Sequence, residues 1–162
     1  MAYLPLLSAG MTVKWCVETT AGTRPTTGYT IMYGVKEIAA YNDAPNTAQT
    51  TDLLAYPNHT YIRALNSGNG VLSITANDYK TFRDCWDAMV SAYNTGKASG
   101  KALWIEYAYP DGSSMKSYYY TAEPAELGFG GAQVDSVLEN SAYLIMTGQP
   151  KFDAASTGSI SA

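Results

Sequence analysis

The residues that could do chemistry are few and widely spaced in this chain of 162 amino acids. The single histidine, His59, lies in a Pro- and Asn-flanked stretch with no serine or cysteine placed beside it as a nucleophile. A histidine in that setting is far more often a solvated loop residue than a general base. Asn58–Thr60 matches a glycosylation acceptor, but this match means little without a secretion signal.

Two carboxylates, Asp135 and Glu139, come closest to an acid–base pair. On an extended strand they would share one face and lie about 13 Å apart. The paired carboxylates of glycoside hydrolases are closer, at about 5 to 9.5 Å. A solvated strand face is therefore the favoured interpretation. A hydrolase would have to bring carboxylates together from separate strands.

Sequence patterns for metal, calcium or phosphate binding are weak. Cys16 and Cys85 have no metal-ligand spacing and predict reduced thiols, although one disulfide stays open as an alternative. The glycines of GFGG lack the strand–turn–helix context of a phosphate loop. Asp111 in the turn PDGS offers too few oxygen donors for calcium. The sequence thus predicts no catalytic residue, no cofactor and no metal, and we expect that the protein is not an enzyme.

Tyrosine is the strongest bias of composition, with fourteen residues against three phenylalanines and three tryptophans. Tyrosine suits protein interfaces, and it is also a good strand former, so both explanations stay open. The run Tyr118–Tyr120 has the composition of a base-stacking platform. In a strand, however, Tyr119 points away from its two neighbours, and only Lys116 adds local positive charge. We favour packing in a core or an interface.

Composition and charge indicate a single globular domain. Hydrophobic residues make up 46% of the chain and charged residues 15%, with a net charge of −4. Such a chain can bury a sizeable core, and its low charge suggests that much of its outside meets other protein. The negative balance argues against gripping phosphates. MAYLPLLSAG is not a convincing signal peptide, no segment is suited to cross a bilayer, and we expect a soluble protein.

One helix and several strands are expected to position these residues. Apolar residues recur at three- and four-residue steps over about 78–95, which predicts an amphipathic helix capped by Asn77 or Asp78 and ended by Gly96. Turn residues predict that 61–65 and 71–75 form one hairpin and that 102–109 and 115–124 form another. With a further strand in 33–41, the chain is mainly β: a β-sandwich or partly closed barrel with one flanking helix.

Residues 132–146 alternate between an apolar face and a face that carries Gln133, Asp135 and Glu139. This alternation predicts a half-buried strand, whose unusual length allows a bend near Asn140. Two further segments are polar. We expect the stretch from about 41 to 58 to form a protruding hairpin, and 148–162 to be a flexible tail or docking arm.

Six segments follow one another in the order ETTAGTRPTTGYT, GVKEI, TYIRALNSGNGVLSITANDY, NDYKTFRDCWDAMVSAY, KSYYYTAEPAELG and AQVDSVLENSAYLIMTG. Together they resemble the major tail tube proteins of long-tailed (siphovirus-type) bacteriophages. Each segment alone is degenerate, and it is the succession that carries the resemblance. The likeness covers roughly residues 11–149.

The resemblance implies a β-sandwich whose subunits form hexameric rings, which stack into a hollow tail tube. Such a tube holds the tape-measure protein and passes DNA during ejection without binding it specifically. Its ends meet the tail terminator and the baseplate or distal tail proteins. The protein would then belong to the virion tail, be assembled in the host cytoplasm and have no membrane partner.

The resemblance also divides the chain into an N-terminal arm (1–12), a tail-tube-like domain (13–147) and a C-terminal arm (148–162). The arms would bind adjacent subunits, and the long loop at about 41–58 would reach the neighbouring ring. The residues expected to anchor this loop are Tyr41, Leu53, Leu54 and Tyr56.

Under the same resemblance, Gln133, Asp135 and Glu139 would face the lumen of the tube. Their carboxylates would form a negative wall that repels DNA phosphates within a Debye length of about 8 Å. The rival hypothesis is a monomeric β-sandwich that binds carbohydrate or acts as an adhesive module through its tyrosines. That hypothesis predicts a stable monomer, binding to glycans and no long polymers.

Overall fold

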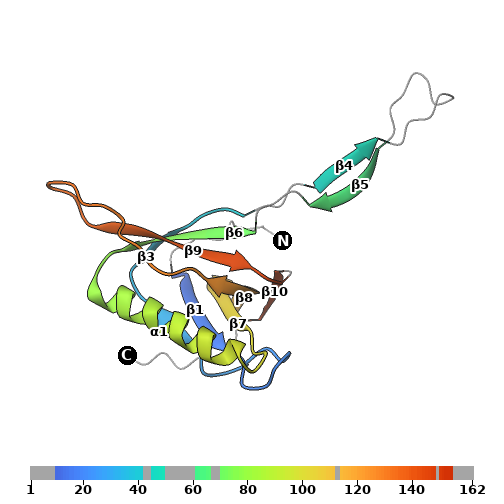
Figure 1. Ribbon diagram of the computed structural model, residues 1–162, viewed down its shortest axis with the longest axis horizontal. Helices are drawn as coiled ribbons and strands as arrows, with labels where there is room; N and C mark the ends of the chain where they lie inside the picture. Colours follow the sequence, from blue (N-terminus) through green and yellow to red (C-terminus); the bar gives the residue numbers. More distant parts are fainter. Residues whose placement is uncertain are drawn as a thin grey trace.

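The computed structural model describes residues 10–41, 45–49, 61–66, 70–111, 114–148 and 150–154. These residues form a mainly β structure with one flanking helix, which confirms the predicted fold class (Figure 1). The elements are β1 Thr12–Val17, β2 Thr30–Met32, β3 Val35–Ile38, β4 Pro45–Gln49, β5 Tyr61–Asn66, β6 Val71–Asn77, α1 Lys80–Lys97, β7 Leu103–Asp111, β8 Ser114–Pro124, β9 Glu139–Met146 and β10 Lys151–Ala154.

Eight antiparallel strands form one open sheet in the order β2-β1-β7-β8-β9-β6-β3, with β10 also paired to β8. The long strand β8 joins two halves of this sheet. Its residues 116–119 pair with β10, and only Ala122–Pro124 pair with β9. The first half (β2, β1, β7, β8 and β10) and the second half (β9, β6 and β3) therefore run in different directions (Figure 1).

One hydrophobic core is shared by α1 and the inner faces of both halves. The helix contributes Phe82, Trp86, Met89 and Tyr93, which are buried and recur at three- and four-residue steps as the sequence predicts. The sheet halves contribute alternate residues of their strands, which a half-buried strand turns to one side. The largest of these are Trp15, Leu72, Ile74, Leu103, Ile105, Tyr107, Tyr120 and Leu144.

The N-cap of the helix lies one residue after Asp78 and two after Asn77, the two predicted caps. Tyr79 occupies the N-cap position with extended backbone and makes no capping hydrogen bond from its side chain. Asp78 does not cap because its carboxylate accepts a hydrogen bond of 2.6 Å from Arg83 Nη2. This charged contact across the first turn replaces the expected cap.

The predicted end of the helix at Gly96 is also wrong. Gly96 is buried inside the last turn, and α1 continues to Lys97. A Cβ atom at this position would lie 2.7 Å from Cγ1 of Val17, so glycine is needed there for close packing of α1 on β1. The chain turns instead at Gly100, whose φ of +70° favours glycine.

The stretch 132–146 is not a single strand, contrary to the sequence prediction. Asp135 has a φ of +60°, and the hydroxyl of Ser136 donates a hydrogen bond of 2.9 Å to the carbonyl of Gln133. This local turn breaks the extended conformation, so β9 begins only at Glu139. Gln133 and Asp135 therefore do not share a strand face with Glu139. From Glu139 onward the predicted alternation of buried and exposed residues is confirmed.

One predicted hairpin is confirmed and the other is not. Strands β7 and β8 pair without interruption from Leu103–Ala122 to Asp111–Ser114. By contrast, β5 does not pair with β6. It pairs with β4 in a separate two-stranded sheet, whereas β6 lies between β3 and β9. The inward residues of β6 are buried in the shared core, and a central position in the second half gives this strand two neighbours.

The hairpin of β4 and β5 projects away from the main sheet (Figure 1). Within the predicted long loop, Tyr41 is partly buried against the core. Leu53, Leu54 and Tyr56 lie outside the described residues, as does His59. Their predicted role as anchors therefore stays a prediction.

The predicted C-terminal arm contains a strand. Residues Lys151–Ala154 form β10 and pair with Tyr119 to Lys116 of β8. This part of the arm thus completes the chain's own sheet, and residues 155–162 lie outside the described part. Residues 1–9 of the predicted N-terminal arm also lie outside it.

In the described part of the chain, no helix combines the length and the apolar character that are needed to span a membrane.

Candidate interaction surfaces

A buried carboxylate, Glu106 of β7, is the strongest electrostatic feature of the described chain. Its neighbours Ile105 and Tyr107 point into the core, so Glu106 lies on the other face of the first half. It is fully buried, with Lys14 Nζ 3.3 Å from Oε1 and Arg24 Nη2 3.1 Å from Oε2. Arg24 also lies over the ring of Tyr119, 3.5 Å from its centroid.

These contacts attach the segment between β1 and β2 to the sheet. Each oxygen of Glu106 faces a cation, so both oxygens are already engaged within the protein. A general base needs an oxygen that can reach a substrate proton. We therefore assign Glu106 a structural role. It was missed in the sequence, where a glutamate inside the apolar strand LWIEYAY was the available signal.

A second carboxylate, Glu18, holds the end of β1. Its oxygens accept hydrogen bonds from the backbone N–H groups of Gly22 at 2.8 Å and Ala102 at 3.1 Å, and from Trp104 Nε1 at 2.9 Å. Burial raises the pKa of Glu18, but the three hydrogen bonds outweigh burial and lower that pKa below its usual range. Glu18 thus ties β1 to the connection that follows α1.

The tyrosine run is packed inside the molecule. Tyr120 is fully buried, and its hydroxyl hydrogen-bonds with that of Tyr107. Burial raises the pKa of Tyr107 to about 12 and the pKa of Tyr120 well above its ordinary value. Tyr118 stacks on Tyr107 with ring centroids 5.9 Å apart, and Tyr119 is buried on the opposite face. This arrangement matches the packing interpretation and leaves no stacking platform for bases.

Both cysteines are free thiols, so the alternative of a disulfide between them is excluded. Cys85 accepts a hydrogen bond of 3.3 Å from Trp15 Nε1 on the inner side of β1. Cys16 follows Trp15 on the strand and therefore points to the other side. Burial raises the pKa of both thiols, which makes them poor nucleophiles at neutral pH.

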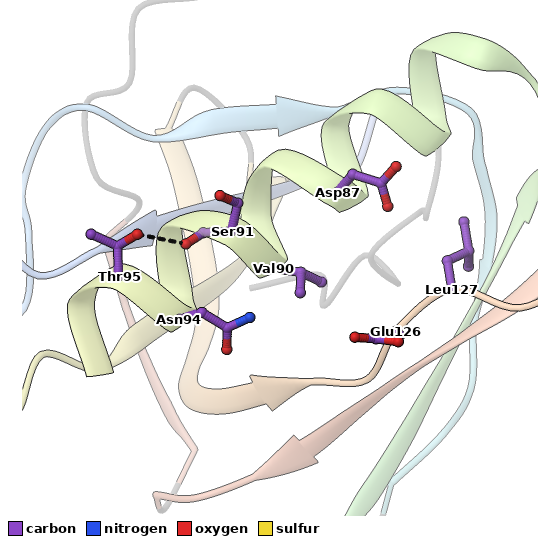
Figure 2. Close-up of a pocket in the computed structure, with 7 residues that line it drawn as sticks. All are labelled: Asp87, Val90, Ser91, Asn94, Thr95, Glu126 and Leu127. Carbon is purple, nitrogen blue, oxygen red and sulfur yellow. Dashed lines mark hydrogen bonds between the residues drawn. The ribbon is translucent and has the colours of Figure 1, made fainter. Parts of the chain in front are cut away.

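An open pocket of about 590 Å³ lies between the outer side of α1 and the residues that follow β8. Figure 2 shows Asp87 and Asn94 on the helix across from Glu126, and the hydroxyl of Thr95 donates a hydrogen bond of 3.0 Å to the carbonyl of Ser91. The residues that line it include no histidine or cysteine. Among the described residues, no three His, Cys, Asp or Glu side chains are grouped as metal ligands.

The second half of the sheet leaves one broad face uncovered, which we call the β6–β9 outer face. Cross-strand pairs place apolar residues at one end and polar residues at the other. At the polar end Glu139 forms an ion pair with Lys36 of β3. At the apolar end Tyr143 is 49% and Ile145 is 46% exposed. The face comprises Val71, Ser73, Thr75, Asn77, Glu139, Ser141, Tyr143 and Ile145.

The structure brings only one of the three predicted lumen residues to this face. Glu139 begins β9, whereas Gln133 and Asp135 are exposed in the connection before it. The same connection carries a feature that the sequence reasoning missed. Four of its apolar side chains are exposed: Phe129, Val134, Val137 and Leu138. The signal in the sequence was the glycine-flanked phenylalanine of GFGG.

Comparisons with known proteins identify the fold. No protein-family model matches the sequence, and no curated protein matches it. A similar solved structure is a chain of the anti-feeding prophage (AFP) baseplate, determined by cryo-EM with six-fold symmetrisation. The TM-score is 0.62, the identity is 10%, and the match covers 96% of this chain and 100% of that chain. At this identity the likeness shows a shared fold and leaves function to be argued separately.

Proposed function

We propose that this protein is a structural subunit of a phage-type tail, which assembles as stacked hexameric rings into the tail tube. The observation that carries the proposal is the match, over nearly all of both chains, to a component of a six-fold symmetric prophage assembly. The order of segments that resembles tail tube proteins supports the same conclusion. A tube subunit needs interfaces rather than an active site, which fits the fully engaged carboxylate of Glu106.

The open sheet offers two edges for ring formation. Strands β2 and β3 end the order of the sheet, and an edge strand presents unpaired backbone groups to a neighbour. Because only Tyr33 and Gly34 separate β2 from β3, both edges border the same groove, and a neighbour would contact them with a different part of its surface. Such a heterologous contact closes a ring when the rotation repeats. In this arrangement α1 lies outside, and the β6–β9 outer face lines the lumen. The projecting hairpin of β4 and β5 reaches the next ring.

The charge of the proposed lining is uneven. Glu139 is paired with Lys36, so its charge is largely balanced, and Asp135 is exposed off this face, in the connection four residues earlier. The net charge of −4 adds a repulsive background for phosphates. The tape-measure protein would occupy the lumen first, and DNA would then pass through it without being held. The terminator and the distal tail proteins would cap the tube in the virion, after assembly in the host cytoplasm.

The lumen assignment has a matched test in a phage whose tail is built from this chain. Glu139→Lys should leave tubes intact but lower infectivity, because phosphates would adhere to the wall. The control, Asp84→Lys on α1, also replaces an exposed carboxylate that is paired with a lysine and should leave infectivity unchanged. Normal infectivity of the first variant would contradict the lumen assignment.

Ring formation is tested by light scattering on the purified protein over a concentration series. We expect the mass to rise from one subunit to six and then to multiples of six. A single subunit at every concentration, with binding to glycans, would favour the carbohydrate-binding alternative. That alternative is weakened by the burial of Tyr107, Tyr119 and Tyr120, which cannot present their rings to a sugar.

A further inference from the structure

The connection between β8 and β9, residues 125–138, projects from one end of the molecule (Figure 1). Its apolar side chains are unusually exposed: Phe129 by 75%, Val134 by 86%, Val137 by 69% and Leu138 by 42%. Exposed apolar residues scattered singly need no explanation, but four of them in ten residues form a patch of the kind that marks interaction sites. We call this connection the 125–138 segment.

An apolar groove of about 730 Å³ lies between β1, β2 and β3. Met32 and Val13 form its buried floor, and Ile31, Val35 and Ile38 are partly exposed along it. The groove is less open and more apolar than the pocket of Figure 2. It therefore has the character of a site for apolar side chains.

We propose that the 125–138 segment of one copy inserts into the β1–β2–β3 groove of a second copy. The tip of the segment points away from the body in Figure 1, so it does not fill the groove of its own chain. A chain that carries both an apolar projection and an apolar groove can bind head to tail, and such a contact closes into a ring when the rotation repeats.

The patch is one contact among several rather than a complete interface. Four side chains and a groove of this size bury less than the approximately 1,200 Å² of a stable interface. The contact can therefore act only beside other contacts between neighbours of the proposed ring, such as those of the sheet edges. The inference therefore rests on the proposed ring and specifies one of its contacts.

The test combines cross-linking with a matched pair of surface variants. One protein carries Val134→Cys and a second carries Ile38→Cys, and the two are mixed under mild oxidation. A disulfide-linked dimer is expected in the mixture and in neither protein alone. Separately, Phe129→Ser with Val134→Ser should raise the concentration for assembly about tenfold, because two apolar contacts are lost. The control, Tyr143→Ser with Ile145→Ser on the β6–β9 outer face, should raise it far less.

The outcomes separate this inference from the proposed function. If the variant Phe129→Ser with Val134→Ser assembles normally and the two cysteine variants form no cross-link, the inference is overturned and the rings are left standing. The same result would arise if residues 1–9, which precede the groove residue Met11, occupied the groove instead. A wild-type chain that never assembles would overturn the proposed function and this contact with it. Equal loss of assembly in the control variant would also overturn the specific role of the segment.

Discussion

Removal of the charge of Glu106 tests whether the segment between β1 and β2 is held by buried ion pairs. The substitution Glu106→Gln keeps the size of the side chain and its ability to accept hydrogen bonds. It leaves Lys14, whose side chain is only 8% exposed, beside a neutral group. Arg24 is 22% exposed and can turn partly towards water.

The expected cost follows from this difference in exposure. Breaking a buried ion pair by removing one partner costs about 3–5 kcal/mol, because an uncompensated charge stays buried. Since Arg24 can recover some hydration, we expect the lower end, about 3 kcal/mol. For a domain of this size, such a loss lowers the melting temperature by about 6–12 °C. It is also a large part of a typical folding stability of about 5–15 kcal/mol.

Urea denaturation followed by circular dichroism gives the free energy of unfolding for each variant. The control is Asp84→Asn, which breaks the exposed pair of Asp84 with Lys80 on α1 and should cost at most about 0.5 kcal/mol. Replacing both Lys14 and Glu106 with Met should recover part of the loss, because the buried ammonium group is removed together with the carboxylate and only the partly exposed Arg24 loses its partner. The reasoning fails if Glu106→Gln costs no more than the Asp84 control.

Three further predictions concern Glu18, Gly96 and the hairpin. Because hydrogen bonds lower the pKa of Glu18 in the folded state, its contribution is present above the unfolded pKa of about 4.3 and is lost as the pH falls through the lower folded value. Glu18→Gln should therefore cost about 2 kcal/mol in urea denaturation at pH 7 and much less at pH 2; an equal cost at both would contradict this. Gly96→Ala should lower stability by about 1 kcal/mol by crowding Val17, despite the higher helix propensity of alanine; a stabilised variant in a thermal melt would show that the contact yields. Deletion of 46–55 should preserve the circular dichroism spectrum and single rings but stop stacking in electron micrographs, and an unfolded product would place this loop in the core.

Patterns among neighbouring residues predicted the helix, one hairpin and the buried face of β9. The apolar steps from Phe82 to Tyr93 predicted α1, and the turn at 110–113 predicted the β7–β8 hairpin, which is confirmed residue by residue. Alternation also predicted which residues of β9 are buried from Glu139 onward. In each case neighbours in sequence supply most of the physical constraint.

Features that depend on distant contacts were not predictable in this way. The turn at Asp135 and Ser136 interrupts an alternating pattern without a proline to announce it. Strand β6 pairs with β3, which precedes it in the chain, and with β9, which follows it more than sixty residues later. The contacts of Glu106 combine β1, β7 and the segment before β2, so no single stretch of sequence contains them.

Electron microscopy of the purified protein, imaged over the concentration series used for light scattering, tests the central claim most directly. We expect hollow tubes or stacked rings, with end views that average to six-fold symmetry. Particles of single subunits at every concentration, or assemblies without a central channel, would contradict the proposal that this chain forms a tail tube.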